Sequence, residues 1–274
     1  MASRPRLSAL VLLLATPTTH ALAAAKRRKP SKPKTNEPDY VDIQDGDGSL
    51  SNFHRCDLGD PEAIDSVVEA VGGPIDSLFN CAGLPTTAPD RQVMLVNFCG
   101  HRHLTELVIP LMVPGGSIAF ISSVAGMGWI ANAASMLAFV AEPDFPGGEA
   151  WLDANPEPWT ANGYACSKEA INAYVAWRGF QLASEGIRLN SLNPGPTDTP
   201  MMPSFIESQG QEFFDNFPKP IGRNSTAEEQ AWCLVMLNSP RSSYVVATSV
   251  FADGGFTGGL FTGGIDPTVL MPQE

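Results

Sequence analysis

From residue 40 onward, short apolar runs rich in β-forming residues alternate with longer segments of helical periodicity. The runs YVDIQ, IDSLFNCAG and GGSIAFISSVAG are typical of strands that are buried in a sheet. Between them lie helical patterns such as 61–72, which begins with proline and carries its apolar residues on one face. This alternation is typical of βαβ units and predicts an α/β fold with a parallel sheet.

The rest of the chain continues this alternation of strands and helices. Further strands are predicted at 52–58 and in the runs IRLNSLNPG and YVVATSVFADGG, and long helices at 93–111 and 162–186. Ser225 and Glu228 have the spacing of a capping box at the start of a late helix. The glycine-rich tail from Gly258 is predicted to lie on the surface.

Composition narrows the possible partners. The chain has 274 residues, 43% of them hydrophobic, which is enough for one domain with a complete core. The formal net charge of -12 argues against nucleic acid or an anionic membrane as a partner, and no apolar run approaches the roughly 20 residues of a membrane span. The cysteines lack zinc-site spacing, so we expect no metal and predict buried thiols in a reducing compartment for Cys56, Cys81, Cys99, Cys166 and Cys233.

Tyr164 and Lys168 stand four positions apart within the predicted helix 162–186. This spacing places both side chains on one face of the helix, one turn apart. An ammonium beside a phenol favours the phenolate, so we expect the pKa of Tyr164 to lie below its usual value near ~10. Such a group can exchange a proton with an alcohol or carbonyl oxygen. Taken alone, the same pair is also typical of a solvated helix face.

Further motifs flank this pair in a fixed order. FNCAG, VNFCG and ISSVAG precede it, and NPGPTDTP follows it. In this order and spacing, residues 39–255 resemble the short-chain dehydrogenase/reductase family, with its N-A-G turn, helix asparagine, strand-end serine, Y-x-x-x-K helix and P-G motif. The resemblance implies a single-domain Rossmann-like fold with a doubly wound parallel sheet, and an oxidoreductase that uses a nicotinamide cofactor.

The resemblance also implies catalytic roles. Tyr164 would be the general acid and base, and Lys168 would lower its pKa and hydrogen-bond the nicotinamide ribose. Ser123 would hold the substrate oxygen, whereas Ser122 is expected to be structural. Asn97 would anchor a water relay to the lysine.

For the cofactor, the resemblance implies a second set of residues. Asp42 ends a strand at the position whose carboxylate hydrogen-bonds the ribose 2′-hydroxyl and repels a 2′-phosphate, which predicts NAD rather than NADP. The alternative for Asp42 is a plain turn residue. The other expected cofactor contacts are Asp57 and Leu58 at the adenine, Asn80, Ala82 and Gly83 along its ribose, and Thr197 and Thr199 near the carboxamide and pyrophosphate.

Ser123 and Tyr164 are 41 positions apart, whereas the commoner family pattern places them roughly a dozen apart. The insert, taken as 127–160, contains a G-x-A-W-L-x-x-N-P element. It resembles the subgroup with bacterial 3α-hydroxysteroid dehydrogenase/carbonyl reductase and coniferyl-alcohol dehydrogenase. In that subgroup the insert alters the helix surface through which many relatives dimerise, so we expect a homodimer through another face, or a homotetramer.

A segment rich in methionine and phenylalanine, 199–218, follows the P-G motif. Its position corresponds to the mobile substrate lid of the family, whose closure would exclude water from hydride transfer. Composition alone allows an amphipathic helix packed on the sheet equally well. We expect an apolar substrate pocket in either case, with Trp129 and Met202 as candidate walls.

The first 38 residues depart from the family. They contain eight basic residues and no glycine, so the family's T-G-x-x-x-G-x-G phosphate loop has no counterpart. Three interpretations stay open, of which we favour the first: a mis-translated or wrongly started segment, a signal peptide ending at ALAAA, or a degraded first strand (7–15), turn (16–20) and helix (21–29). The first strand and helix of the fold are therefore expected to be atypical or missing. The domain would then span 39–257, followed by a tail, 258–274.

Together these features predict a cytoplasmic, NAD-dependent short-chain dehydrogenase. It would interconvert a hydrophobic alcohol, steroid-like or aromatic, and its carbonyl compound. A non-catalytic Rossmann-like binding or scaffold protein that has lost the phosphate loop is the main alternative. An isomerase or dehydratase on the same scaffold is a further one.

Overall fold

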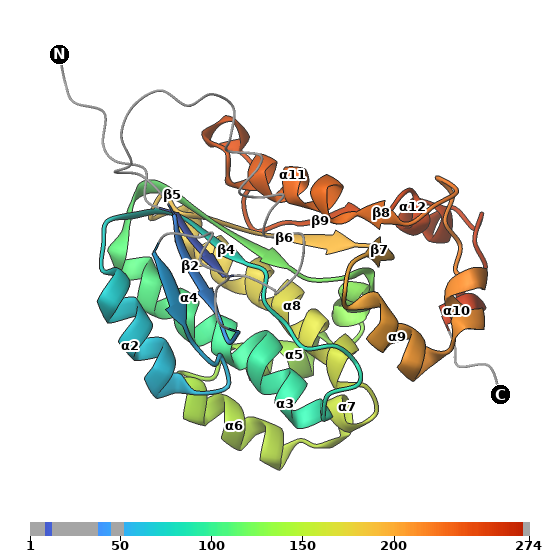
Figure 1. Ribbon diagram of the computed structural model, residues 1–274, viewed down its shortest axis with the longest axis horizontal. Helices are drawn as coiled ribbons and strands as arrows, with labels where there is room; N and C mark the ends of the chain where they lie inside the picture. Colours follow the sequence, from blue (N-terminus) through green and yellow to red (C-terminus); the bar gives the residue numbers. More distant parts are fainter. Residues whose placement is uncertain (1–8, 13–37, 45–51, 271–274) are drawn as a thin grey trace.

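The computed structural model of the chain describes residues 9–12, 38–44 and 52–270. Its main sheet has seven strands in the order β3-β2-β1-β4-β5-β6-β9, and neighbouring strands run parallel (Figure 1). The strands are β1 (Ala9–Leu12), β2 (Asp39–Asp42), β3 (Phe53–Arg55), β4 (Ile75–Asn80), β5 (Met112–Ile121), β6 (Arg188–Pro194) and β9 (Ser249–Ala252). The predicted α/β fold with a parallel sheet is confirmed.

Strand β1 lies in the middle of the sheet, between β2 and β4. Leu10 is in register with Asp39 on one side and with Leu78 on the other. The strand falls inside segment 7–15, where one of the three interpretations of the head placed a first strand, although it is shorter. The turn 16–20 and the helix 21–29 of that interpretation lie outside the described residues. The sheet thus takes one of its interior strands from the segment ahead of residue 39.

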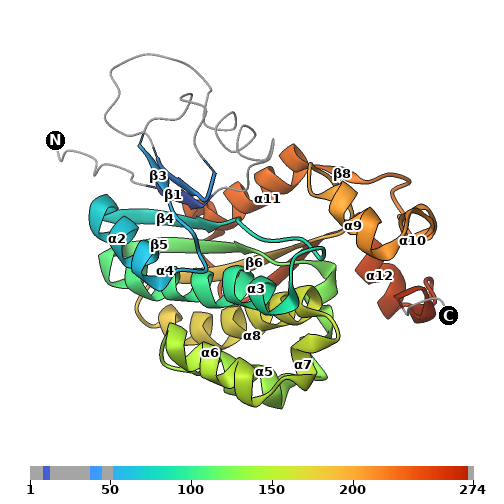
Figure 2. The ribbon, with the colours of Figure 1, turned by 60° about the horizontal axis from the view of Figure 1, so that its bottom comes forward.

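Helices cover both faces of the sheet (Figures 1 and 2). One face carries α2 (Pro61–Val71), α3 (Asp90–Met94), α4 (His101–Val108) and α8 (Gly163–Ala183), and the other carries α11 (Ala227–Asn238). The single helix predicted over 93–111 is instead interrupted. A π-helical turn, Leu95–Gly100, separates α3 from α4, and a 3₁₀ turn, Ile109–Leu111, ends the run. The wide turn lies at Asn97, one of the expected site residues.

The capping box of α11 was predicted one residue too early. The Thr226 hydroxyl accepts a hydrogen bond from the Glu229 backbone N–H at 3.2 Å, and Glu229 Oε2 accepts one from the Thr226 N–H at 2.8 Å. Ser225 lies in a short strand, β8 (Ser225–Thr226), which pairs with β7 (Thr197–Asp198). Both frames have the same spacing, and the Ser225 hydroxyl instead contacts the Thr197 hydroxyl at 2.8 Å and accepts from the Gln230 amide at 2.9 Å.

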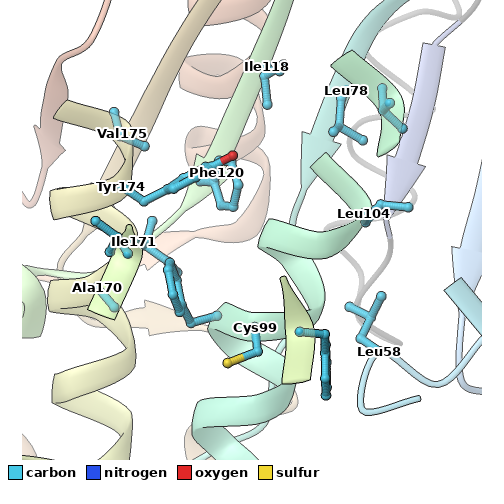
Figure 3. Packing of buried hydrophobic residues seen from close by; sticks show 14 of the residues in the cluster. Leu58, Leu78, Cys99, Leu104, Ile118, Phe120, Ala170, Ile171, Tyr174 and Val175 are labelled. Atoms are coloured by element: carbon cyan, nitrogen blue, oxygen red, sulfur yellow. The ribbon is translucent and has the colours of Figure 1, made fainter. Parts of the chain in front are cut away.

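The core divides between the two faces of β5. Ile118 and Phe120 point into the larger cluster, among α2, α4 and α8, where Phe120 meets the ring of Tyr174 edge-on at 5.9 Å (Figure 3). Ala119, between them in sequence, belongs to the smaller cluster under α11. This alternation follows from the two-residue period of a strand. All five cysteines are free thiols. Four of them are buried, as predicted, whereas Cys233 is only half-buried.

The insert forms three helices, α5 (Ala133–Val140), α6 (Phe145–Ala154) and α7 (Glu157–Thr160). They make a further layer on the outer side of α8 (Figure 2). The Trp151 ring stacks on Phe139 at 4.5 Å, and the guanidinium of Arg102 from α4 donates to the carbonyl of Asp144 at 3.1 Å. The insert therefore covers the outer surface of α8 with a packed layer.

Two helices, α9 (Met202–Gln209) and α10 (Gln211–Asn216), lie beyond the carboxyl end of β6 (Figure 1). The predicted surface tail begins inside α12 (Phe256–Phe261) and continues to a 3₁₀ turn, Pro267–Leu270. Phe261 is 78% exposed, in keeping with a surface position. Among the described helices, none combines the length and the apolarity needed to cross a membrane.

Candidate active site

Tyr164 and Lys168 lie together in the first turns of α8. The helix begins after Asn162, whose side-chain oxygen accepts a hydrogen bond from the Ala165 N–H at 2.9 Å. The Lys168 ammonium lies over the face of the Tyr164 ring, 5.4 Å from its centre. It also donates to the carbonyl of Ile121, at the end of β5, at 3.0 Å. The pair therefore turns inward, toward the end of a central strand.

The expected direction of the Tyr164 pKa was wrong. Burial raises the pKa of Tyr164 to about 12, and a hydrogen bond with Ser123 opposes this rise only in part. Burial also lowers the pKa of Lys168 to about 8. The nearby Cys81 acts in the opposite direction and raises this pKa, but by less. The helical spacing correctly predicts that the two groups lie close together, but burial is the main cause of both pKa shifts. At neutral pH the tyrosine is protonated and the lysine is charged.

The two serines at the end of β5 have different partners. The Ser123 hydroxyl accepts a hydrogen bond from the Ala125 N–H at 3.1 Å and also forms a hydrogen bond with the Tyr164 hydroxyl. The Ser122 hydroxyl is buried and donates to the Lys168 backbone carbonyl at 2.9 Å. Ser122 thus ties β5 to α8, which agrees with the structural role expected for it.

A cavity of about 470 Å³ opens in front of Ser123 and Tyr164. Its far wall comes from the segment after the P-G motif, and the ring of Phe205 meets Tyr164 edge-on at 5.1 Å. The apolar side chains of this wall are Met201, Met202, Phe205, Phe213, Phe214 and Phe217. The apolar character of the pocket and the place of Met202 in its wall are confirmed.

Trp129 is not a wall of this cavity, contrary to expectation. Its side chain packs against the larger core cluster instead. Trp129 lies in the 3₁₀ segment Val124–Ile130, which turns it away from the cavity.

Thr197 and Thr199 both line the cavity in front of Ser123 and Tyr164. The Thr197 hydroxyl donates a hydrogen bond to the Gly195 carbonyl at 3.0 Å.

A second cavity, of about 350 Å³, lies at the carboxyl ends of β2, β3 and β4. Five expected cofactor residues line it: Asp42, Asp57, Leu58, Ala82 and Gly83. The Asp42 carboxylate accepts a hydrogen bond from the Gln44 N–H at 3.0 Å, and burial raises its pKa. Met201 lines both cavities, so the two adjoin. Their combined shape suits an extended ligand that runs from Asp42 to Tyr164.

The structure does not bring the Asn80 side chain to this cavity. Asn80 is fully buried, and its amide donates to the Thr105 hydroxyl of α4 at 3.0 Å. Successive side chains of a strand point to opposite faces, so a residue at a strand end can face a helix while its neighbours face a ligand.

Asn97 uses its side chain to hold a turn. Its oxygen accepts from the Leu84 N–H at 2.7 Å, and its amide donates to the Leu84 carbonyl at 3.1 Å. The Asn97 backbone carbonyl accepts from Nδ1 of His101 at 3.1 Å. The role of Asn97 in a water relay stays a prediction, because the described contacts of its side chain are structural.

Two polar residues near the site, His101 and Glu169, were not predicted from the sequence. His101 is fully buried, its Nε2 has no hydrogen-bond partner among the described residues, and burial together with the charge of Lys168 lowers its pKa to about 3. Glu169 lines the catalytic cavity. The only available signal for each was its distance in sequence from a motif residue, four positions after Asn97 and one after Lys168.

Comparisons with known proteins agree with this geometry. A family model described as short chain dehydrogenase matches residues 40–136, and one described as enoyl-(acyl carrier protein) reductase matches 156–257. The coniferyl-alcohol dehydrogenase of Pseudomonas sp. strain HR199 is 33% identical over 211 residues, which cover 76% of this chain and 81% of the relative. The 3α-hydroxysteroid dehydrogenase/carbonyl reductase of Comamonas testosteroni is 33% identical over 223 residues, covering 78% and 84%.

A solved structure shares the fold. It is that of a 3α-hydroxysteroid dehydrogenase from Pseudomonas sp. B-0831, complexed with NADH. It superimposes with a TM-score of 0.75 and 23% identity, and the match covers 94% of this chain and 100% of that chain.

Proposed function

The chain belongs to the short-chain dehydrogenase/reductase family, and we propose that it interconverts a hydrophobic alcohol and its carbonyl compound with NAD as the hydride carrier. One observation carries the proposal: Ser123, Tyr164 and Lys168 meet at one end of an apolar cavity. The relatives named for coniferyl alcohol and 3α-hydroxysteroids make an aromatic or steroid-like alcohol the first class to test.

Tyr164 acts as the proton donor and acceptor at the substrate oxygen. Its raised pKa keeps it protonated at neutral pH, the form that carbonyl reduction requires. Ser123, which shares a hydrogen bond with the tyrosine, holds the same substrate oxygen and orients it. Lys168 stabilises the phenolate as the proton leaves, because its ammonium lies over the ring. A bound nicotinamide supplies the carbon that gives or accepts the hydride.

The residues present fit the adenosine end of a nicotinamide dinucleotide. The sheet reverses its order between β1 and β4, and the second cavity lies beside this switch point. Ligands of doubly wound sheets bind at such a point. Asp42, at the end of β2, would accept a hydrogen bond from the ribose 2′-hydroxyl and repel a 2′-phosphate, which favours NAD over NADP. The segment that would face the pyrophosphate lies outside the described residues.

The wall formed by α9 and α10 would serve as a lid. Its methionine and phenylalanine side chains face the cavity, so closure over an apolar substrate would expel water from the reacting atoms. We take the lid as 199–218, the insert as 127–160 and the tail as 258–274. We further propose a cytoplasmic homodimer or homotetramer whose contacts avoid the surface covered by α5, α6 and α7.

The proposal is tested with the full chain and its Tyr164→Phe variant. NADH binding is followed by fluorescence, and oxidation of aryl and steroid alcohols by the absorbance of the NADH formed. We expect both proteins to bind NADH equally and the variant to lose about 10²- to 10⁴-fold in turnover. Turnover retained by the variant would refute the role of Tyr164. No binding of NADH or NADPH at millimolar concentration would support the scaffold alternative.

A further inference from the structure

Glu169 is the one charged side chain among the described residues that line the catalytic cavity. It follows Lys168 directly, but helical rotation turns it away from the lysine and toward Ala165, which also lines the cavity. The remaining lining side chains are apolar, hydroxylic, amide or thiol groups. A single carboxylate in such a wall can accept a hydrogen bond from a ligand in the cavity.

The contacts of Glu169 within the chain leave much of the carboxylate unused. Oε2 accepts a hydrogen bond from the Asn132 amide at 2.8 Å. Within the described part of the chain, Glu169 has no ion pair with a lysine, arginine or histidine. Gly128 leaves room for the second oxygen, because a methyl group there would come within 2.8 Å of Oε1.

The second carboxylate oxygen of Glu169 is within reach of a donor in the cavity, because it is not among the buried side-chain atoms that lack a hydrogen-bond partner. Glu169 is half-buried, and burial raises its pKa while the Asn132 hydrogen bond lowers it. A carboxylate accepts up to about four hydrogen bonds, so Glu169 can accept others besides the one from Asn132. A hydrogen-bond donor on a bound substrate would supply one of these.

We propose that Glu169 is a substrate-recognition residue, which accepts a hydrogen bond from a hydroxyl group at the end of the substrate remote from the reacting alcohol. This inference rests on the proposed function, since Tyr164 defines the reacting end. Tyr164 and Glu169 both line the cavity and stand five positions apart, which is about 7.5 Å along the helix axis at about 1.5 Å per residue and about 140° around it. An aromatic ring with a short side chain spans such a length.

The chemistry favours a neutral hydroxyl over an ammonium as the donor. Methionine and phenylalanine side chains from segment 199–218 form much of the wall of the cavity that Glu169 lines. An ammonium would lose its hydration against this wall, whereas a phenol or alcohol loses far less. The preferred substrate is therefore an apolar alcohol with a second hydroxyl at its far end.

The test compares coniferyl alcohol, which carries a phenolic hydroxyl opposite its reacting alcohol, with its phenol methyl ether. The ether has the same body but no donor. We expect the wild-type chain to lose at least about tenfold in kcat/KM on the ether, mainly through KM. Glu169→Met should turn over the ether about as well as the wild type and lose the preference for the phenol.

Asn132→Ala is the matched control. It removes the contact that Glu169 makes within the chain but leaves the carboxylate, so the preference for the phenol should persist. Calorimetric titration of both compounds into the protein with NADH reads the same preference without turnover. Equal handling of the two compounds by the wild type, or an undiminished preference in Glu169→Met, would overturn the inference. If neither compound is turned over but the binding preference holds, the proposed function fails while the recognition role stands.

Discussion

Leu84 and Asn97 exchange two hydrogen bonds, so that the turn after β4 is fastened to the π-helical turn between α3 and α4. The Leu84 N–H donates at 2.7 Å and the Leu84 carbonyl accepts at 3.1 Å. Asn97 is fully buried, so neither bond is easily replaced by water. Because Leu84 lines the second cavity, this contact links the geometry of the helix to that cavity.

Replacement of Asn97 should therefore destabilise the protein. In Asn97→Ala, both backbone groups of Leu84 lose their partner, and we expect the free energy of unfolding to fall by about 1–3 kcal/mol. Asn97→Asp should also be destabilised, because the carboxylate can accept from the Leu84 N–H but faces the Leu84 carbonyl without a donor. Urea unfolding measures both. A change below about 0.5 kcal/mol in Asn97→Ala would mean that the exchange contributes little.

Asp42 should control the choice between NAD and NADP. In Asp42→Asn the amide oxygen can still accept from the Gln44 N–H, but the negative charge that would face the ribose 2′ position is removed. We expect NADPH to bind at least about tenfold more tightly than to the wild type, with a smaller change for NADH. Fluorescence titration with both cofactors measures the ratio.

Asp39→Asn provides the matched control for this change. Asp39 lies on the same strand but contacts His54 at 3.2 Å and does not line the cavity. The ratio of the two affinities should stay at its wild-type value in this variant. An unchanged affinity of Asp42→Asn for NADPH would remove Asp42 from the choice of cofactor.

His101 should make the protein sensitive to acid. Its pKa is about 3 in the fold, against an ordinary value of 6.5. Between these values the unfolded chain binds a proton that the folded chain does not, so stability is complete above pH 6.5 and falls as the pH drops toward 3. The loss from this group should approach about 1.4 kcal/mol per pH unit.

The measurement compares urea unfolding of the wild type and His101→Asn at pH 7, 6 and 5. The wild type should lose stability relative to the variant at each step down. His103→Gln, which alters a part-exposed histidine beside Asp65, should not reproduce this difference. Parallel pH profiles of the wild type and His101→Asn would show that His101 does not titrate in this way.

Several site features required more than the sequence. The side-chain direction of Asn80 and the rotation of Trp129 depend on elements packed from elsewhere, and both turned away from their expected cavities. In the sequence, nothing distinguishes Glu169 from other acidic residues of a helix. Only the folded chain shows that it lines the same cavity as segment 199–218. The fold was more predictable, because turns, caps and apolar periodicity are local signals that recur along the chain.

The sequence by itself determined the order of strands and helices and the meeting of Tyr164 with Lys168, because a helical period of 3.6 residues is a local property. Only the tertiary structure decided the protonation of that pair. The end of β5, the thiol of Cys81 and helix α9 come from distant parts of the chain, and their packing around the two groups removes water from them. Desolvation depends on everything that packs around a group. The spacing of Tyr164 and Lys168 along the helix therefore does not predict that the tyrosine is protonated and the lysine charged.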